Sequence, residues 1–336
     1  MADRAEMRAR METYVAPLVA GLLALVTLIG LIGPAIQSPA PHDIPVGIVG
    51  APQLAAQFEA NAPGAFDFTN YDSEAAARAA IDSREIDGAL VVGAGGPRLI
   101  VAGAAGDGAT GVITGAFTNV FKQQGQTLAV ETVHPFAVGD PHGLILFFVV
   151  LAVLVSTLIA QALVGLRRGM RFVTRLSLVV AFAFIAAPTA MGLATWIAGD
   201  YGSGFWLATA LVVLGSAAVG AVVAGSAALL GRPGIALAAL IVVLLDLVCS
   251  GGPIGSQLLP DAYRWLAPGM PAGQLYSAIR GALYFNGAGL AEPFGVLSLW
   301  LLGGLILMVL GQFVSRRAPA PEGAMAANLA PHGADR

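Results

Sequence analysis

The sequence predicts an α-helical polytopic membrane protein with six transmembrane helices and a small α/β extracytoplasmic domain between helices 1 and 2. Of the 336 residues, 57% are hydrophobic and only 11% are charged, against about 25% charged in typical soluble domains. The mean hydropathy is +0.79, and six apolar stretches approach the roughly 20 residues that a helix needs to cross a bilayer. One long segment between the first two stretches holds most of the acidic residues and the only lysine, which indicates a folded domain outside the lipid.

The six predicted helices comprise one N-terminal span and a five-helix transmembrane domain over residues 142–314. Their approximate bounds are 15–36, 143–166, 176–198, 205–230, 235–250 and 293–314. Because Arg4, Arg8 and Arg10 precede the first stretch, a cleaved signal peptide is the alternative there. A signal peptide has an apolar region of about 7–15 residues followed by a small-residue cleavage site. The first stretch is longer and lacks such a site, which favours a retained helix.

The arginines predict the orientation, because segments that stay in the cytoplasm are enriched in Lys and Arg. With six spans, the arginine-rich segments all fall on one side, so both termini are expected in the cytoplasm. A composition rich in Ala, Gly and Arg with a single Lys favours a bacterial protein, and hence the cytoplasmic (inner) membrane. The arginines expected on the cytoplasmic side are Arg4, Arg8, Arg10, Arg167, Arg168, Arg171, Arg175, Arg232, Arg316 and Arg317.

Residues 37–141 are expected to form the extracytoplasmic α/β domain, since roughly 100 residues suffice for one small domain. Ser73 is a plausible N-cap for an alanine-rich helix, and two apolar runs flank the turn residues Gly95-Gly96-Pro97 as in a β-hairpin. The predicted strands are 44–49, 66–69, 88–92 and 98–102, and the predicted helices lie near 53–61, after Ser73, and over about 110–130.

A second external region, rich in Gly and Pro, covers residues 251–292 and is too long for a simple turn. It contains a short amphipathic piece over 274–285 and several aromatic residues of the kind enriched at membrane interfaces. We expect an interfacial or partly re-entrant cap over the outer mouth of the bundle. Residues 1–14 are expected to form a cytoplasmic amphipathic segment, and the Ala/Pro-rich residues 315–336 a disordered cytoplasmic tail.

The sequence offers no recognisable catalytic apparatus, so we expect that the protein is not an enzyme. Nowhere do glycines precede Lys-Ser or Lys-Thr, as a nucleotide-binding P-loop requires. The histidines lack metal-ligand spacing, and the single cysteine, Cys249, cannot form a disulfide within the chain. The expected sites therefore include no catalytic, cofactor or metal residues. A net charge of −3 without a basic arm also makes nucleic acid an unlikely partner class, whereas membrane lipid is an expected one.

Two features inside the predicted spans attract attention. Asp246 lies in the fifth span, where a carboxylate is costly and usually faces the bundle interior or water. It is a candidate for the substrate path or a dimer axis, and a hydrogen-bonded structural role is the alternative. In the fourth span, small residues at a spacing of four predict a packing face, either within or between subunits. This stripe consists of Ser216, Gly220, Ala224 and Ala228.

A cluster of four arginines occupies the segment between the second and third spans. One hypothesis is that it fixes the topology and meets anionic lipid. The other is that it docks a cytoplasmic partner. The cluster consists of Arg167, Arg168, Arg171 and Arg175.

Three features occur in order over residues 12–315. The first helix is followed by the strand sequence IPVGIVG (44–50) and by SEAAARAAIDSREIDGALVV (73–92), an acidic, alanine-rich helix that leads into a strand. Five apolar helices follow. The last external loop then contains Leu259-Pro260, Met270-Pro271, Arg280 and Tyr284-Phe285. This layout resembles the type-2 ABC exporter permease superfamily, nearest its YhgE/Pip-like (phage infection protein-like) branch.

The resemblance implies a permease subunit that exports a hydrophobic or amphipathic substrate with energy from a separate ABC ATPase subunit. Six helices would form half a pathway, which implies a homodimer or a related permease partner, and the arginine cluster would contact the ATPase. The chain departs from the commoner family pattern at Gly50-Ala51-Pro52, where an acidic residue often follows the first strand. The alternative function is a non-transporting cell-envelope protein, a receptor or secretion scaffold, that presents its external domain.

Overall fold

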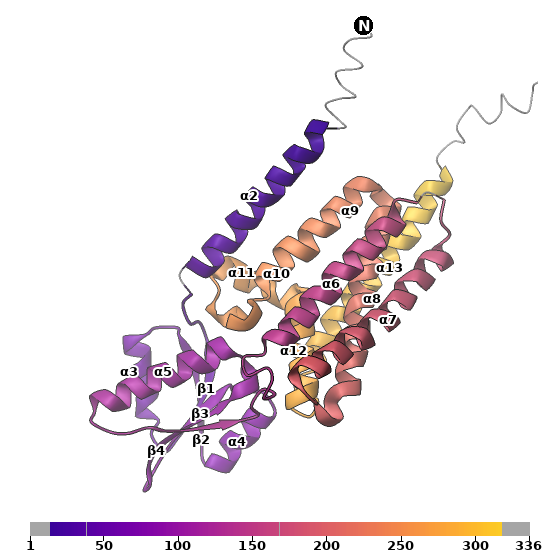
Figure 1. Ribbon diagram of the computed structural model, residues 1–336. Coiled ribbons are helices and arrows are strands. Elements are labelled where there is room, and N and C mark those ends of the chain that lie inside the picture. Colours follow the sequence, from indigo (N-terminus) through magenta and orange to yellow (C-terminus); the bar gives the residue numbers. More distant parts are fainter. Residues whose placement is uncertain (1–13, 38, 168, 318–336) are drawn as a thin grey trace, which may run out of the picture.

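The structure is a computed structural model that describes residues 14–317, apart from 38 and 168. An apolar helix, α2 (Ala16–Gln37), leads into an α/β domain, and a bundle of long helices follows (Figure 1). The predicted segment 1–14 and tail 315–336 lie almost wholly outside the described residues. The two parts of the molecule meet at one end of the bundle, where short helices fill the junction.

The α/β domain is built on a five-stranded sheet with the strand order β2-β1-β3-β4-β5. β1 pairs in parallel with both β2 and β3, β3 and β4 form an antiparallel hairpin, and β4 pairs in parallel with β5. The predicted strands are thereby confirmed, and the second strand extends two residues further than expected. The strand bounds are β1 (Ile44–Val49), β2 (Phe66–Tyr71), β3 (Gly88–Gly93), β4 (Gly96–Ala102) and β5 (Ala129–Val133).

Helices cover both faces of this sheet, which gives a three-layered α/β/α domain (Figure 1). On one face, Phe58 of α3 and Phe117 of α5 pack with their ring centroids 4.5 Å apart. On the other face, α4 buries Ala77 and Ile81 against the sheet. The predicted N-cap is confirmed, because the Ser73 hydroxyl accepts a hydrogen bond of 3.2 Å from the backbone N–H of Ala76. The helices are α3 (Gln53–Asn61), α4 (Glu74–Asp82) and α5 (Asp107–Gln123).

The helix predicted over 110–130 is wrong in its last turns. α5 ends at Gln123, and Gly125 then adopts a left-handed φ of +71° that turns the chain back. The next residues form β5, whose Ala129 pairs with Arg98 of β4. The β-branched residues Val130 and Thr132 favour this extended segment, and pairing with the exposed edge of β4 supplies the backbone hydrogen bonds that a helix would otherwise make internally.

Five helices in the described part of the chain are long and apolar enough to cross a membrane. The chain is therefore a multi-pass membrane protein. The candidate spans are Leu144–Gly165, Phe172–Ala198, Gly202–Leu230, Arg232–Cys249 and Ala291–Val314. They correspond to α6 (Leu144–Gly165), α7 (Phe172–Ala198), α8 (Phe205–Leu230), the series α9 (Arg232–Ala239), η4 (Leu240–Leu245) and α10 (Asp246–Cys249), and α13 (Ala291–Arg317).

The fourth of these spans in chain order is not one uninterrupted α-helix, as its apolar sequence had suggested. The segment η4 is a π-helical turn between α9 and α10. A π-helical turn widens the helix by one residue per turn and changes the direction of the side chains that follow. Asp246, the first residue of α10, comes directly after this turn.

Helix α8 occupies the centre of the bundle and contacts α6, α7, α12 and α13. Glycines permit its closest approach: a Cβ on Gly304 of α13 would lie 2.4 Å from the backbone nitrogen of Val222, and a Cβ on Gly225 would lie 2.6 Å from the carbonyl oxygen of Gly304. Backbones at this separation pack through small residues. The close contacts of α8 with α13 thus depend on small residues.

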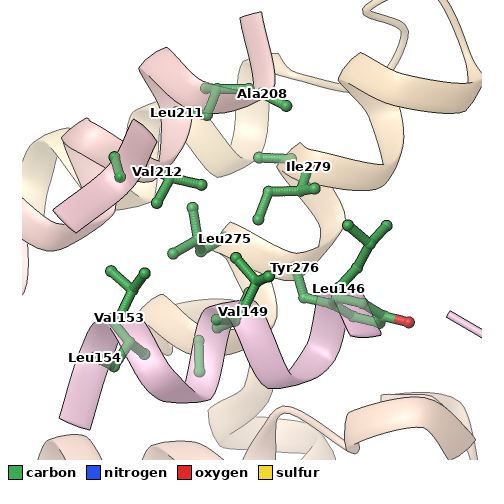
Figure 2. Close-up of a cluster of buried hydrophobic side chains, with 14 of the residues drawn as sticks. Leu146, Val149, Val153, Leu154, Ala208, Leu211, Val212, Leu275, Tyr276 and Ile279 are labelled. Carbon is green, nitrogen blue, oxygen red and sulfur yellow. The ribbon is translucent and has the colours of Figure 1, made fainter. Parts of the chain in front are cut away.

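The segment predicted as an external cap contains the helices α11 (Asp261–Leu266) and α12 (Pro271–Tyr284), with short 3₁₀ turns around them. Helix α12 packs among α6, α8 and α13 instead of lying over their ends. Its Leu275, Tyr276 and Ile279 point into a cluster of apolar side chains from α6 and α8 (Figure 2). Nine residues of α12 are buried, which agrees with the partly re-entrant alternative for this segment, and its position relative to the membrane interface stays a prediction.

Candidate functional site

A cavity of about 510 Å³ lies where the α/β domain meets the cap region of the bundle. We call it the junction chamber. One wall comes from the domain, from the start of β1 and the segment between α4 and β3. The other comes from α12, the residues that precede it, and the start of α13. Cavities that bind small molecules typically have 300–1,000 Å³. The charged side chains that line the junction chamber are Asp43, Arg84, Asp87, Arg264, Arg280 and Glu292.

Arg84 enters the chamber from the C-terminal end of α4. Its backbone has a left-handed φ of 64°, a conformation that usually selects glycine at this position after a helix. The guanidinium donates hydrogen bonds to Ser277, of 3.1 Å to the carbonyl oxygen and 3.0 Å to the hydroxyl. It also lies over the ring of Phe285, 5.2 Å from the centroid. A strained backbone thus directs a long cation from the domain onto α12 and the residues after it.

Two glycines make room for this guanidinium. A Cβ on Gly281 would lie 2.8 Å from Nη1 of Arg84, and a Cβ on Gly289 would lie 3.2 Å from the same atom. The pKa of Arg84 is lowered to about 10, mainly because the side chain is buried and also because the charge of Arg280 is near, while Asp87 acts in the opposite direction. The side chain remains protonated at neutral pH, so a positive charge is held in a partly buried position.

Arg280 reaches the chamber from α12, on the opposite wall. Its guanidinium donates to the carbonyl oxygens of Ala104 and Ala105, which follow β4. It lies over the ring of Tyr276, 4.6 Å from the centroid, as expected for side chains four residues apart on one helix face. Its Nε is buried, and in the described part of the chain it has no hydrogen-bond acceptor. Arg280 therefore anchors the domain while one of its donors stays unused.

Asp87 lies on the domain wall, directly before β3. Its backbone is fixed on both sides, because its N–H donates to Pro45 and its carbonyl oxygen accepts from Ala102, each at 2.9 Å. Its carboxylate accepts one hydrogen bond of 3.3 Å, from the side-chain amide of Gln257. Burial raises the pKa of Asp87 to about 6, although Arg280, Arg84 and the amide hydrogen bond each act to lower it.

Glu292 completes the set of charged groups at the first turn of α13. Its carboxylate accepts a hydrogen bond of 3.2 Å from the side-chain amide of Gln274. That amide also donates to the carbonyl oxygen of Pro268 at 2.9 Å, which holds it in place. Elsewhere on the chamber wall, Arg264 and Asp43 form an ion pair of 2.9 Å.

The candidate Asp246 lies outside the chamber lining and is fully buried. Both carboxylate oxygens accept hydrogen bonds from the backbone N–H of Ala272, at 2.8 and 3.0 Å. Ala272 is the second residue of α12, after Pro271. A helix N-terminus presents unpaired N–H groups and favours a negative charge. Asp246 thus caps α12, which fits the structural alternative for this residue; the role in a substrate path stays a prediction.

The arginines of the predicted cluster differ in how exposed they are to solvent. Arg167 and Arg171 are exposed at the end of the bundle opposite the α/β domain, and Arg168 lies outside the described residues. Arg175 is only 7% exposed, and its Nη1 donates to the carbonyl oxygen of Ala224 on α8 at 3.3 Å. This buried contact gives Arg175 a structural role between α7 and α8, and the docking role of the four arginines stays a prediction.

The small-residue stripe on α8 faces helices of the same chain. The Ser216 hydroxyl shares a hydrogen bond of 2.9 Å with that of Thr157 on α6. A Cβ on Gly220 would lie 3.1 Å from the side chain of Val179 on α7. The carbonyl of Ala224 accepts from Arg175, and Ala228 lies against Gly311 of α13. Of the two alternatives, packing within the subunit is therefore the one the contacts support.

The chamber's charged residues were missed as a site by sequence reasoning. Arg84 and Asp87 lie about 200 positions before Arg280 and Glu292, and no local spacing relates the two pairs. The one local signal is Arg84 itself, because an arginine stands at the end of a helix where glycine is the common residue. Among the described residues, no group of three or more His, Cys, Asp or Glu side chains could hold a metal ion.

Comparison with known proteins gives no assignment. No protein-family model, curated protein or solved structure matches the chain. What the fold and the junction chamber define is the general class, a multi-pass membrane protein with an α/β domain at one end of its bundle.

Proposed function

We propose that the chain is the membrane permease subunit of an ABC-type exporter, which moves a hydrophobic or amphipathic substrate outward. The observation that carries the proposal is the junction chamber, a polar cavity between the end of an apolar bundle and the docked α/β domain. In this proposal α2 is a first span and the five candidate spans follow, so six helices form half of a pathway. A second copy, or a related permease, supplies the other half.

The proposed orientation places the α/β domain outside the bacterial cytoplasmic membrane and both termini in the cytoplasm. It rests on the arginines at the far end of the bundle, Arg167 and Arg171, since cytoplasmic loops are enriched in such residues. The chain has no P-loop sequence, so a separate ATPase supplies the energy. That subunit docks on the segment between α6 and α7, which includes Arg168.

A route from this docking segment to the chamber runs through packed helices. Helix α6 contacts α8 and α12, and α7 contacts α6 and α8. Movement of the docking segment upon ATP-driven closure tilts α6 and α7, and α6 transmits the tilt to α12. Because α12 carries Arg280, which holds the domain at Ala104 and Ala105, the tilt changes how the domain closes the chamber.

The test is affinity purification of the tagged protein from its native membrane in mild detergent, followed by mass spectrometry. We expect a stoichiometric P-loop ATPase with the wild-type chain and its loss with the triple variant Arg167→Ala, Arg168→Ala and Arg171→Ala. The matched control is Arg98→Ala, which removes a half-exposed arginine from the α/β domain. Reproducible absence of an ATPase from the wild-type sample would refute the proposal.

The alternative, a cell-envelope receptor or scaffold, has one observation in its favour. A groove of about 640 Å³ runs between α5 and the segment around β5 and is lined by small side chains of α5. The fully exposed Val138 lies at its edge. Envelope or secretion proteins in the same purification, in place of an ATPase, would support this second function.

A further inference from the structure

We propose that the junction chamber binds a zwitterion, with an anionic phosphate or carboxylate group against Arg84 and Arg280 and an ammonium group against Asp87 and Glu292. The inference deepens the proposed function by naming a substrate class, and as a substrate claim it rests on that function. The binding itself depends only on the chamber.

The two arginines form the anionic subsite. Both guanidinium groups donate to neutral acceptors, namely the carbonyl or hydroxyl groups of Ser277, Ala104 and Ala105. Among the ion pairs of the described residues, none includes either arginine. Within the described residues neither arginine therefore forms an ion pair, and the nearest opposite charge, Asp87, acts on both from beyond contact distance. The two charges act on each other across the chamber, and the buried Nε of Arg280 has no acceptor in the described structure. An oxyanion between them would accept charge-assisted hydrogen bonds.

The two carboxylates form the cationic subsite. Asp87 accepts from the amide of Gln257, and Glu292 accepts from the amide of Gln274. These donors are neutral, so within residues 14–317, apart from 38 and 168, neither carboxylate contacts a cation. The four charges sum to zero. A ligand of one sign would meet repulsion from one pair, whereas a ligand with both signs meets a complementary group at each pair.

The position of the chamber favours a lipid-like source for the zwitterion. It lies where the apolar bundle ends and the domain begins. Nearby, Trp265 of α11 is 82% exposed. Tryptophan is enriched at the level of membrane headgroups. A phosphate and an amine joined by a short linker, as in a phosphoethanolamine headgroup, match the two subsites. A free small zwitterion shares this chemistry, so the experiment includes both forms.

The experiment measures binding to the purified full chain in a non-ionic maltoside detergent after removal of bound lipid. The probes are free O-phosphoethanolamine, dihexanoyl phosphatidylethanolamine, and dihexanoyl phosphatidylglycerol as an anion without an amine. Binding is followed by calorimetry and by the shift in thermal unfolding. The variants are Arg280→Gln for the anionic subsite, and Asp87→Asn and the exposed Glu292→Gln for the cationic subsite. Arg78→Gln, an arginine outside the chamber, is the matched control.

We expect both ethanolamine probes to bind, and the variants of each subsite to weaken this binding by at least tenfold, with Arg78→Gln unchanged. Phosphatidylglycerol should bind more weakly than phosphatidylethanolamine and lose affinity only in Arg280→Gln. Tighter binding of the lipid than of the free zwitterion assigns a headgroup, and equal binding assigns a free solute. No binding of either ethanolamine probe, or full binding in Glu292→Gln and Asp87→Asn, would overturn the proposal. Because no ATPase is present, failure of the permease proposal leaves this result intact.

Discussion

The α/β domain takes part in two groups of four charges that differ in how the charges are used. Between α4 and the strands β4 and β5, a partly exposed network joins Arg78, Arg98, Glu74 and Glu131. In the junction chamber, two arginines and two carboxylates have the same composition but bond only to neutral groups. The surface network neutralises itself, with Arg78 donating at 2.9 Å to Glu74 and 2.6 Å to Glu131. Apart from the ion pairs of Arg264 with Asp43 and Asp261, the charged groups of the chamber form no ion pair among the described residues.

This difference fits the proposed binding of a zwitterion, which needs charged groups that form no ion pair within the chain. Partly buried charges without contacting counterions cost free energy, because desolvation is not offset by a close ion pair. The surface network costs little to form and contributes little, since solvent screens it. In this protein the charges that cost free energy line a cavity, whereas the charges that cost little lie on the surface of the α/β domain. Four substitutions test this difference between the two groups of charges, beginning with the one that should cost the most stability.

The largest effect on stability is expected at Asp246, which caps the N-terminus of α12, a helix that lines the chamber. Asp246→Ala removes the acceptor for the buried N–H of Ala272 and leaves that donor unsatisfied. We expect a loss of about 3 kcal/mol in unfolding free energy, measured by thermal unfolding in detergent. Asp246→Asn keeps an acceptor and should lose about half as much. Wild-type stability of the alanine variant would show that the carboxylate is free for a different role.

The next effect is expected at Gly281, which adjoins the Arg84 guanidinium. A Cβ there would lie 2.7 Å from the carbonyl oxygen of Ala288 and 2.8 Å from Arg84. Gly281→Ala should cost about 2 kcal/mol through overpacking and displace Arg84 from Ser277. Gly115→Ala is the control, because Gly115 is also helical but has open space around it. Equal stability of the two variants would contradict the close packing around Arg84.

A smaller, pH-dependent effect is expected at Asp87. Its pKa is about 6 in the folded chain and 3.8 for an ordinary aspartate. Between about pH 4 and pH 6 the folded state therefore binds a proton that the unfolded state lacks. The free energy of unfolding consequently rises as the pH falls from 6 to about 4. Asp87→Asn should be more stable than wild type by about 1.5 kcal/mol at pH 7. This is less than the free energy that the pKa shift would correspond to in a dry interior, because solvent in the cavity screens the charge. This advantage should vanish below pH 4. Chemical unfolding of both chains across this pH range measures it.

The smallest effect is expected in the surface network. Glu131→Gln removes the β5 carboxylate that pairs with Arg78 of α4, and both side chains are about one-third exposed. We expect a loss below about 1 kcal/mol that shrinks further at high salt. Thermal unfolding at low and high ionic strength provides the measurement. A loss as large as that in Asp246→Ala would show that the network, and not the bundle, holds the domain together.

Local patterns were enough to predict most of the secondary structure. The strand at Ile44–Val49, the Ser73 cap and the hairpin around Gly95 follow from alternation, capping and turn residues. Long apolar runs gave the helices of the bundle, because backbone groups in lipid must bond within their own helix. The errors occurred where the outcome depends on a distant partner. β5 needs the edge of β4, and the burial of α12 needs grooves between α6, α8 and α13.

Composition and periodicity are local quantities, and they were enough to predict a membrane protein with a domain after its first apolar helix. Which charges share a cavity, in contrast, depends on how the domain and the bundle pack together. Arg84 and Asp87 meet Arg280 and Glu292 across about 200 residues of chain, and no spacing in the sequence records that approach. It arises because the domain docks on α12, which Asp246 holds in place from the neighbouring span.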